Sequence, residues 1–226
     1  KHREDTIKSI RRNLDGITKI SKERLINELE KILNTKVLQS ISKDKFSLEI
    51  LEIIFPQLKY FNIFSKLNSY AKKILNEVDF TLLISLLIID ETDNVDYFLY
   101  KFNISKKNQE RIKDLDDFYK DKTTIKKFSK KNLNKLFYYK GKENVIDILN
   151  FKIFKSKILG NDILELLNFY KDKPMPQLPV RANTLMEKYK IPQGKILGDM
   201  LKLIEEEWVN NNFQISDQQI KNIINS

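Results

Sequence analysis

The sequence predicts an all-α protein, and two observations support this fold class. Nearly every segment places apolar residues three or four positions apart, which is the period of an amphipathic helix. Strand-like alternation of polar and apolar residues is scarce along the 226 residues. We therefore expect many helices joined by short connections, without a repeat of fixed length.

The first strongly periodic helix is expected after Ser21. Ser21 suits the N-cap position, and Glu23 lies in the first turn, where the helix dipole favours an acid. The apolar residues are spaced i, i+4, i+7 and i+8: Leu25, Leu29, Ile32 and Leu33. Further helices are predicted over 46–54, 59–76, 79–89, 92–102, 106–120, 123–138, 143–154 and 161–171.

A proline-rich stretch separates these helices from a small C-terminal piece. Residues 171–183 contain three of the five prolines, so this stretch cannot continue as a helix and favours extended backbone. Beyond it we expect a short helix at 182–189, a break at Pro192, and a longer helix that continues through Trp208.

Two of the five glycines, Gly194 and Gly198, stand four residues apart at the start of that longer helix. Each glycine inside a helix costs about 1 kcal/mol relative to alanine, so a reason for the pair is needed. One interpretation is that the glycines let another helix pack closely. The other is that a phosphate lies against the free N–H groups of the helix start, with Lys195 adding charge.

Composition excludes several classes of protein. There is no cysteine and the only histidine is His2, so a disulfide framework, a thiolate metal site and a histidine-based active site are not expected. The longest apolar stretch, residues 80–89, is too short for a bilayer span, which takes about 20 residues. We expect a cytoplasmic protein with no membrane partner. Since the first residue is Lys1, we also expect a fragment of a longer protein.

The net charge of +10 points to a polyanionic partner, of which nucleic acid is the usual one. Residues 120–142 hold nine lysines and one acid, Asp121. With 123–138 as a helix, four of these lysines share one broad face, and Lys126 lies beside them: Lys127, Lys130, Lys131 and Lys135. Such a face tracks phosphates without reading sequence. The alternative is an ordinary solvated basic face. The interleaved aromatics are expected in the core more often than as base-stacking platforms: Phe128, Phe137, Tyr138 and Tyr139.

Two motifs resemble a known family. Residues 17–33, ITKISKERLINELEKIL, resemble the neck-helix motif of bacterial class II tRNA nucleotidyltransferases (CCA-adding enzymes) and the related bacterial poly(A) polymerases. The positions in common are Ser21, Glu23, Arg24, Glu28, Leu29 and Lys31. Residues 179–208 resemble the family's tail, with matches at Pro192, Gly194, Gly198 and Leu201. Ala182 and Asn183 replace the tail's usual glycine and aspartate, and Tyr189 or Lys190 takes the place of its second glycine. Residues 53–58 and 98–115 resemble intervening segments in the family's order.

The resemblance implies a domain order and a role. It assigns neck-like helices to 1–58, a helical body to 59–172, a proline-rich linker to 173–182 and a helical tail to 183–226. The neck motif residues are then Ser21, Glu23, Arg24 and Glu28. In the family, these parts hold tRNA, and we expect tRNA or another RNA to contact the lysines named above together with Gly194, Lys195 and Gly198.

The family's chemistry belongs to an N-terminal head, where a glycine-rich turn holds the triphosphate and paired aspartates bind magnesium. The present sequence has no Gly-Gly pair, and Asp114 and Asp116 follow no glycine-rich loop. We therefore expect no catalytic or metal-binding residue and no cofactor here. Mg²⁺ and CTP or ATP are expected in a missing head, which would be a partner of this chain, and the chain alone should be inactive.

Three functions remain open at this point. The first is the RNA-binding part of a nucleotidyltransferase that adds CCA to tRNA 3′ ends, and the corresponding part of a poly(A) polymerase is its variant. The absence of a basic extension after residue 226 favours the tRNA enzyme. The second is a stand-alone helical RNA-binding or adaptor protein, and the third is a protein-interaction module whose charge is incidental.

Overall fold

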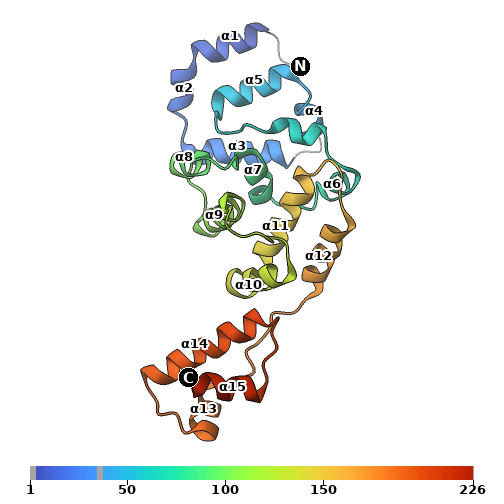
Figure 1. The fold of residues 1–226 in the computed structure, drawn as a ribbon. Helices are drawn as coiled ribbons and strands as arrows, with labels where there is room; N and C mark the ends of the chain where they lie inside the picture. Colours follow the sequence, from blue (N-terminus) through green and yellow to red (C-terminus); the bar gives the residue numbers. More distant parts are fainter. Residues whose placement is uncertain (1–3, 35–37, 226) are drawn as a thin grey trace. The chain divides into compact units, whose positions relative to one another are not determined.

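The computed structural model describes residues 4–34 and 38–225, and this part of the chain contains helices and no strand (Figure 1). The predicted all-α class is confirmed. The Cα atoms cluster into two compact units, each formed by two segments of chain. Unit 1 comprises 1–123 and 147–167, and unit 2 comprises 124–146 and 168–226. The segment boundaries at 58, 172 and 182 stay a prediction.

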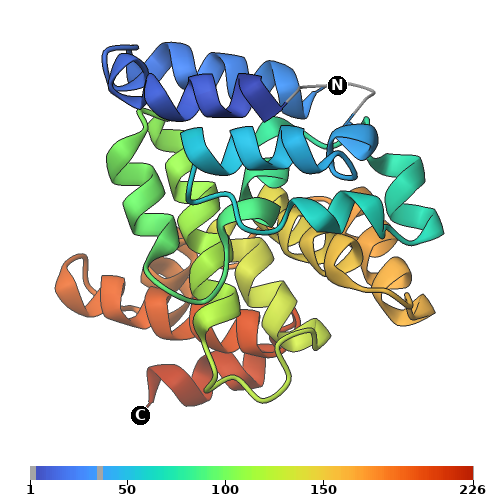
Figure 2. The ribbon, with the colours of Figure 1, turned by 90° about the horizontal axis from the view of Figure 1, so that it is seen from above.

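Most helices belong to unit 1. They are α1 (Glu4–Arg12), α2 (Leu14–Thr18), α3 (Lys22–Leu33), α4 (Leu38–Ile41), α5 (Lys45–Ile54), the 3-10 helix η1 (Phe61–Ser65), α6 (Ser69–Ile74), α7 (Phe80–Ile88), α8 (Asn94–Lys101) and α9 (Lys106–Lys120). The helices α11 (Lys142–Lys155) and α12 (Asn161–Asp172) each divide between the two units. Helix α1 packs along α5, and Figure 2 shows the two side by side.

Helix α7 is the centre of unit 1. All nine of its residues are buried, and it packs against α3, α8 and α9. The hydroxyl of its buried Ser85 donates to the Thr81 carbonyl at 2.7 Å. Asp79 caps the helix by accepting from the Leu82 N–H at 3.0 Å. The apolar stretch at 80–89 is thus a buried core helix, as its length requires.

Arg111 of α9 joins three helices of unit 1. Its guanidinium donates to Asp79 at 2.6 Å and to both carboxylate oxygens of Asp147 at 2.9 Å. Asp79 starts α7 and Asp147 lies in α11, so one side chain ties α7, α9 and α11 together. Partial burial on its own would lower the pKa of Arg111, but the bonds to Asp147 and Asp79 raise that pKa above its ordinary value.

Helix starts follow the sequence closely because short polar side chains cap them. Ser21 accepts from the Arg24 N–H at 3.2 Å, as predicted, and Ser105 caps α9 in the same way.

Two predicted helices are wrong. Residues 59–76 form η1 and α6, with a turn between them that Asn68 ends by capping α6. Residues 123–129 are not helical, because Ser129 caps α10 (Lys130–Lys140) and fixes its start.

Unit 2 has a core of its own. It contains α10 together with α13 (Ala182–Tyr189), α14 (Lys195–Asn210) and α15 (Asp217–Ile224). Helix α14 packs against the other three. The buried side chains that α13, α14 and α15 share are Val180, Leu185, Ile191, Leu197, Ile204 and Ile220. Residues 173–181 carry no helix, in agreement with the three prolines there.

The end of α13 is strained at Lys190, which adopts the left-handed conformation with φ of 59°. The Ile191 N–H closes the turn by donating to the Leu185 carbonyl at 3.4 Å. Helices commonly end in this way on glycine, which adopts positive φ without a steric penalty. Of the two residues that could stand in for the glycine of the family tail, Lys190 is the one that adopts the glycine-type conformation.

No helix within 4–34 and 38–225 combines the length and the hydropathy that a membrane span needs.

We expect Arg111→Leu to lower the free energy of unfolding by about 3 kcal/mol or more, because Asp147 would stay buried without its guanidinium partner. Urea denaturation measures the change. Asp79→Asn is the matched control, since asparagine keeps the cap and Asp79 is half exposed, so its loss should be about 1 kcal/mol or less. Equal losses for the two variants would contradict a structural role for the Arg111 network.

Lys190→Gly should raise the free energy of unfolding by about 1 kcal/mol, because glycine removes the left-handed strain. The melting temperature reports the change. In the control Glu187→Gly, the same residue enters the interior of α13 and should cost about 1 kcal/mol. A melting temperature that falls in both variants would show that Lys190 is not strained.

Candidate nucleic-acid interface

Helix α10 exposes lysines because its opposite side is occupied by the core of unit 2. Leu133, Asn134 and Phe137 are buried. Lys130 and Lys131 are exposed and Lys135 is half-buried. These three lysines therefore present their ammonium groups from the helix surface, as the sequence predicted.

Lys126 and Lys127 lie in the turn before α10, and the prediction that Lys127 belongs to the same helical face is wrong. The turn is fixed by hydrogen bonds that lead into the cap. The Ser129 N–H donates to the Lys126 carbonyl at 2.9 Å, and the Asn132 side chain donates to the Lys127 carbonyl at 2.8 Å. The turn and the helix together make one basic segment, which we call the basic face and define by Lys126, Lys127, Lys130, Lys131 and Lys135.

The charge of the basic face is largely uncompensated. Within the described part of the chain, no carboxylate forms an ion pair with the ammonium groups of four of its members: Lys126, Lys130, Lys131 and Lys135. Two other lysines of the 120–142 window are neutralised by acids from outside it, since Lys120 pairs with Asp116 at 2.7 Å and Lys122 pairs with Glu91. Acids do fold over part of the lysine run, but they do not neutralise these four lysines.

Sequence reasoning missed a lysine beside the basic face. Lys173 follows α12, and its ammonium donates to the Asn134 side-chain oxygen at 2.8 Å. The ammonium also lies 4.7 Å from the Phe213 ring centre and 4.8 Å from that of Phe169. Burial lowers the pKa of Lys173, and repulsion from Lys130 lowers it further. Only the fold brings Lys173 to Asn134, which is 39 positions away in the sequence.

The aromatic residues divide between core and surface. Phe137 is fully buried, and Tyr138 packs edge-on against Trp208 with ring centres 5.3 Å apart. Tyr139 and Phe169 stay exposed, and the Lys130 ammonium lies 5.2 Å from the Phe169 ring. An exposed ring next to an ammonium group can stack a base while the lysine meets its phosphate.

Of the two predicted glycine positions, that of Gly194 needs correction, whereas Gly198 lies near the start of the helix as predicted. Helix α14 begins at Lys195, so Pro192 and Gly194 precede it. Gly194 has φ of 142° and ψ of −159°, a conformation that is essentially restricted to glycine. Gly198 lies inside α14 and is exposed. A Cβ added at either glycine meets no described atom within 4 Å, so the close-packing interpretation is wrong for this part of the chain.

The start of α14 is separated from the part of α14 that meets α10. The Tyr138 hydroxyl of α10 donates to Glu205, which stands ten residues after Lys195, or about 15 Å along the helix. The structure therefore does not merge Gly194, Lys195 and Gly198 with the basic face into one compact pocket. Both sets of residues belong to unit 2.

The neck motif residues lie on the solvent side of α3. Glu23 and Arg24 are exposed, while the helix buries Ile26, Leu29 and Leu33. Glu28 accepts from the Lys31 ammonium at 2.9 Å, an i,i+3 pair on the exposed side of the helix.

No group of three or more histidine, cysteine or acidic side chains suitable for a metal occurs in residues 4–34 and 38–225. Asp116 is buried and bonded to Lys120, so the Asp114–Asp116 pair does not face a shared open site.

These features define a helical region with an uncompensated basic face, and comparison with protein families shows which family it belongs to. The family model described as "tRNA nucleotidyltransferase domain 2 putative" matches residues 76–224, and the one described as "Probable RNA and SrmB- binding site of polymerase A" matches residues 3–62. The chain belongs to the tRNA nucleotidyltransferase and poly(A) polymerase family and corresponds to its RNA-binding body and tail. No curated protein matches the chain.

Gly198→Ala separates stability from RNA contact. We expect the added methyl group to raise the free energy of unfolding by about 1 kcal/mol, because it enters open space in a helix. The same methyl group should weaken tRNA binding, because it stands where the RNA backbone would approach. Thermal melting and fluorescence anisotropy measure the two effects. Gly16→Ala is the control at another open helical position, and equal tRNA affinity in both variants would remove Gly198 from the interface.

Proposed function

We propose that this chain is the tRNA-holding part of a nucleotidyltransferase that adds CCA to tRNA 3′ ends. The observation that supports the proposal most directly is the group of four lysines on the basic face that have no carboxylate partner among the described residues. A folded protein that keeps such a group of charges unpaired is suited to a ligand with regularly spaced negative charges.

The chain's own residues would hold and orient the RNA. The lysines of the basic face contact successive phosphates, and Phe169 offers a ring for an unpaired base. Gly194, Lys195 and Gly198 form a second contact, where the N–H groups at the start of α14 meet a phosphate. The neck motif residues Ser21, Glu23, Arg24 and Glu28 serve the connection to the catalytic head.

The residues described here do not fit the family's magnesium and nucleotide site, so no chemical step is assigned to them. Mg²⁺ and CTP or ATP belong to the catalytic head, which we propose as a partner of this chain. We also propose that the enzyme works in the cytoplasm, because the chain lacks cysteine and its ligand is tRNA.

A poly(A) polymerase is the second candidate, and the match of residues 3–62 to a family described by polymerase A favours it. The two candidates differ in the RNA that they hold. A CCA-adding enzyme holds a folded tRNA, whereas a poly(A) polymerase holds a growing single strand. In competition binding, a preference for folded tRNA over an adenine-rich oligonucleotide of equal length supports the first candidate, and the reverse preference supports the second.

Replacing Lys126, Lys130, Lys131 and Lys135 by glutamine should weaken binding to all RNA sequences alike. Four phosphate contacts give a log–log salt slope of roughly −3 for single-stranded RNA, and we expect the variant to lose that slope. Anisotropy titrations at several salt concentrations measure it.

The matched control replaces four exposed lysines elsewhere, Lys72, Lys106, Lys113 and Lys202, and changes the net charge by the same amount. If both variants flatten the slope equally, overall charge rather than the basic face governs binding, and the proposed interface is wrong.

A further inference from the structure

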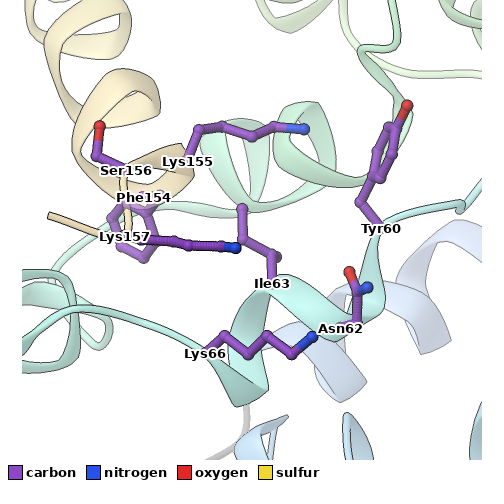
Figure 3. Close-up of a pocket in the computed structure, with 8 residues that line it drawn as sticks. All are labelled: Tyr60, Asn62, Ile63, Lys66, Phe154, Lys155, Ser156 and Lys157. Atoms are coloured by element: carbon purple, nitrogen blue, oxygen red, sulfur yellow. The ribbon is translucent and has the colours of Figure 1, made fainter.

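A pocket in unit 1 gathers lysines that the proposed function does not use. It has a volume of about 300 Å³ and lies between η1 and the end of α11 (Figure 3). Three of its lining residues are lysines and none is acidic: Lys66, Lys155 and Lys157. In Figure 3 the three lysine side chains extend toward the side of the pocket on which Tyr60 and Asn62 lie.

The nearest acids are occupied by other lysines. Asp90 and Glu91 line an adjacent pocket that shares Tyr60 and Lys155. Asp90 is bonded to Lys59 at 2.6 Å and also accepts from Thr92, and Glu91 pairs with Lys122. Within the described part of the chain, Lys66, Lys155 and Lys157 therefore have no ion-pair partner.

Lysines at a helix end often serve only to neutralise its free carbonyl groups. That role is already filled at the end of α11. The Asn68 side chain donates to the carbonyls of Ile153 at 2.7 Å and Ser156 at 2.9 Å. The Ser156 hydroxyl donates to the Lys152 carbonyl at 2.7 Å. The ammonium groups of Lys155 and Lys157 are thus left for a ligand from outside.

Lys155 is held in place against the pocket wall. Its ammonium lies 4.0 Å from the centre of the Tyr60 ring and 5.3 Å from that of Phe151. Burial lowers the pKa of Lys155, although the charges of Asp90 and Glu91 raise it in part. A partly desolvated ammonium over an aromatic ring gains more from an incoming anion than a freely hydrated one does.

We propose that this pocket binds a phosphate group, with Lys66, Lys155 and Lys157 as its cationic contacts and Asn62 as a neutral hydrogen-bond partner. The volume admits more than a bare phosphate, and the Tyr60 ring lies where a sugar or base attached to it would rest. The phosphate can belong to an RNA strand or to a free mononucleotide. The pocket shares no residue with the basic face, and its proposed role does not depend on the function proposed for the basic face.

Two variants remove lysines from the pocket. One is Lys66→Gln at the end of η1, and the other replaces both Lys155 and Lys157 by glutamine at the end of α11. Both remove the charge and keep a polar side chain that is shorter than lysine by one atom, and circular dichroism checks that they fold. The control is Lys113→Gln, an exposed lysine of α9 outside the pocket. CMP and a tRNA are the two probes, measured by calorimetry. The resonances of the Tyr60 ring report whether a ligand enters this pocket.

We expect each pocket variant to lose about tenfold or more in affinity for at least one probe, because each removes a charge-assisted contact. Loss for CMP with unchanged tRNA binding identifies a mononucleotide phosphate, and loss for tRNA identifies an RNA phosphate. If both probes bind the pocket variants as tightly as the Lys113→Gln control, and the Tyr60 resonances do not move, the proposal is overturned. The CMP measurement tests the pocket alone. Its result therefore stays valid even if the basic face does not bind RNA.

Discussion

The architecture of unit 1 depends on the Arg111 guanidinium, which holds the carboxylates of Asp79 and Asp147 at hydrogen-bonding distance. All nine residues of helix α7 are buried, and contacts with α3, α8 and α9 surround it. Asp79 caps α7 and binds Arg111 at once. The same carboxylate therefore links the start of α7 to the packing of α9 and α11.

The same residue type, lysine, has different roles in different parts of this chain. Lys59, Lys120 and Lys122 each bind a carboxylate and stabilise the fold locally. Lys173 is enclosed by aromatic rings and supports Asn134 in unit 2. Among the described residues, four lysines of the basic face and the three of the pocket have no carboxylate partner: Lys126, Lys130, Lys131, Lys135, Lys66, Lys155 and Lys157. This difference in pairing, rather than the net charge, separates candidate ligand contacts from structural lysines.

The sequence was most informative where local interactions decide the structure. Ser21 and the prolines of 171–183 act within a few residues, and the helix ends that they predict are confirmed. The predicted helix at 123–138 failed because periodicity does not reveal that Ser129 ends the turn as a cap. Gly194 was placed inside a helix because a sequence does not display its backbone angles.

The candidate site was harder to predict for a related reason. The lysine run is visible as composition, but the pairing of Lys122 with Glu91 is not, because Glu91 lies 31 positions away in the sequence. Lys173 and the phosphate pocket are assembled from segments far apart in the chain, such as Asn68 and Ile153. Arrangements of this kind depend on the tertiary fold, and periodicity or short motifs do not specify them.

Unit 2 is built from two segments that are separate in the sequence, so its parts are synthesised at different times. Tyr138 is made 67 residues before its partner Glu205. Ribosomes add about 5–20 residues per second. The core-facing side of α10 is therefore synthesised roughly 3–13 s before the α14 residues that cover it. During that interval Phe137 and Tyr138 are exposed beside a cluster of positive charges. Mutual repulsion among those lysines would then keep nascent chains apart until the second segment arrives.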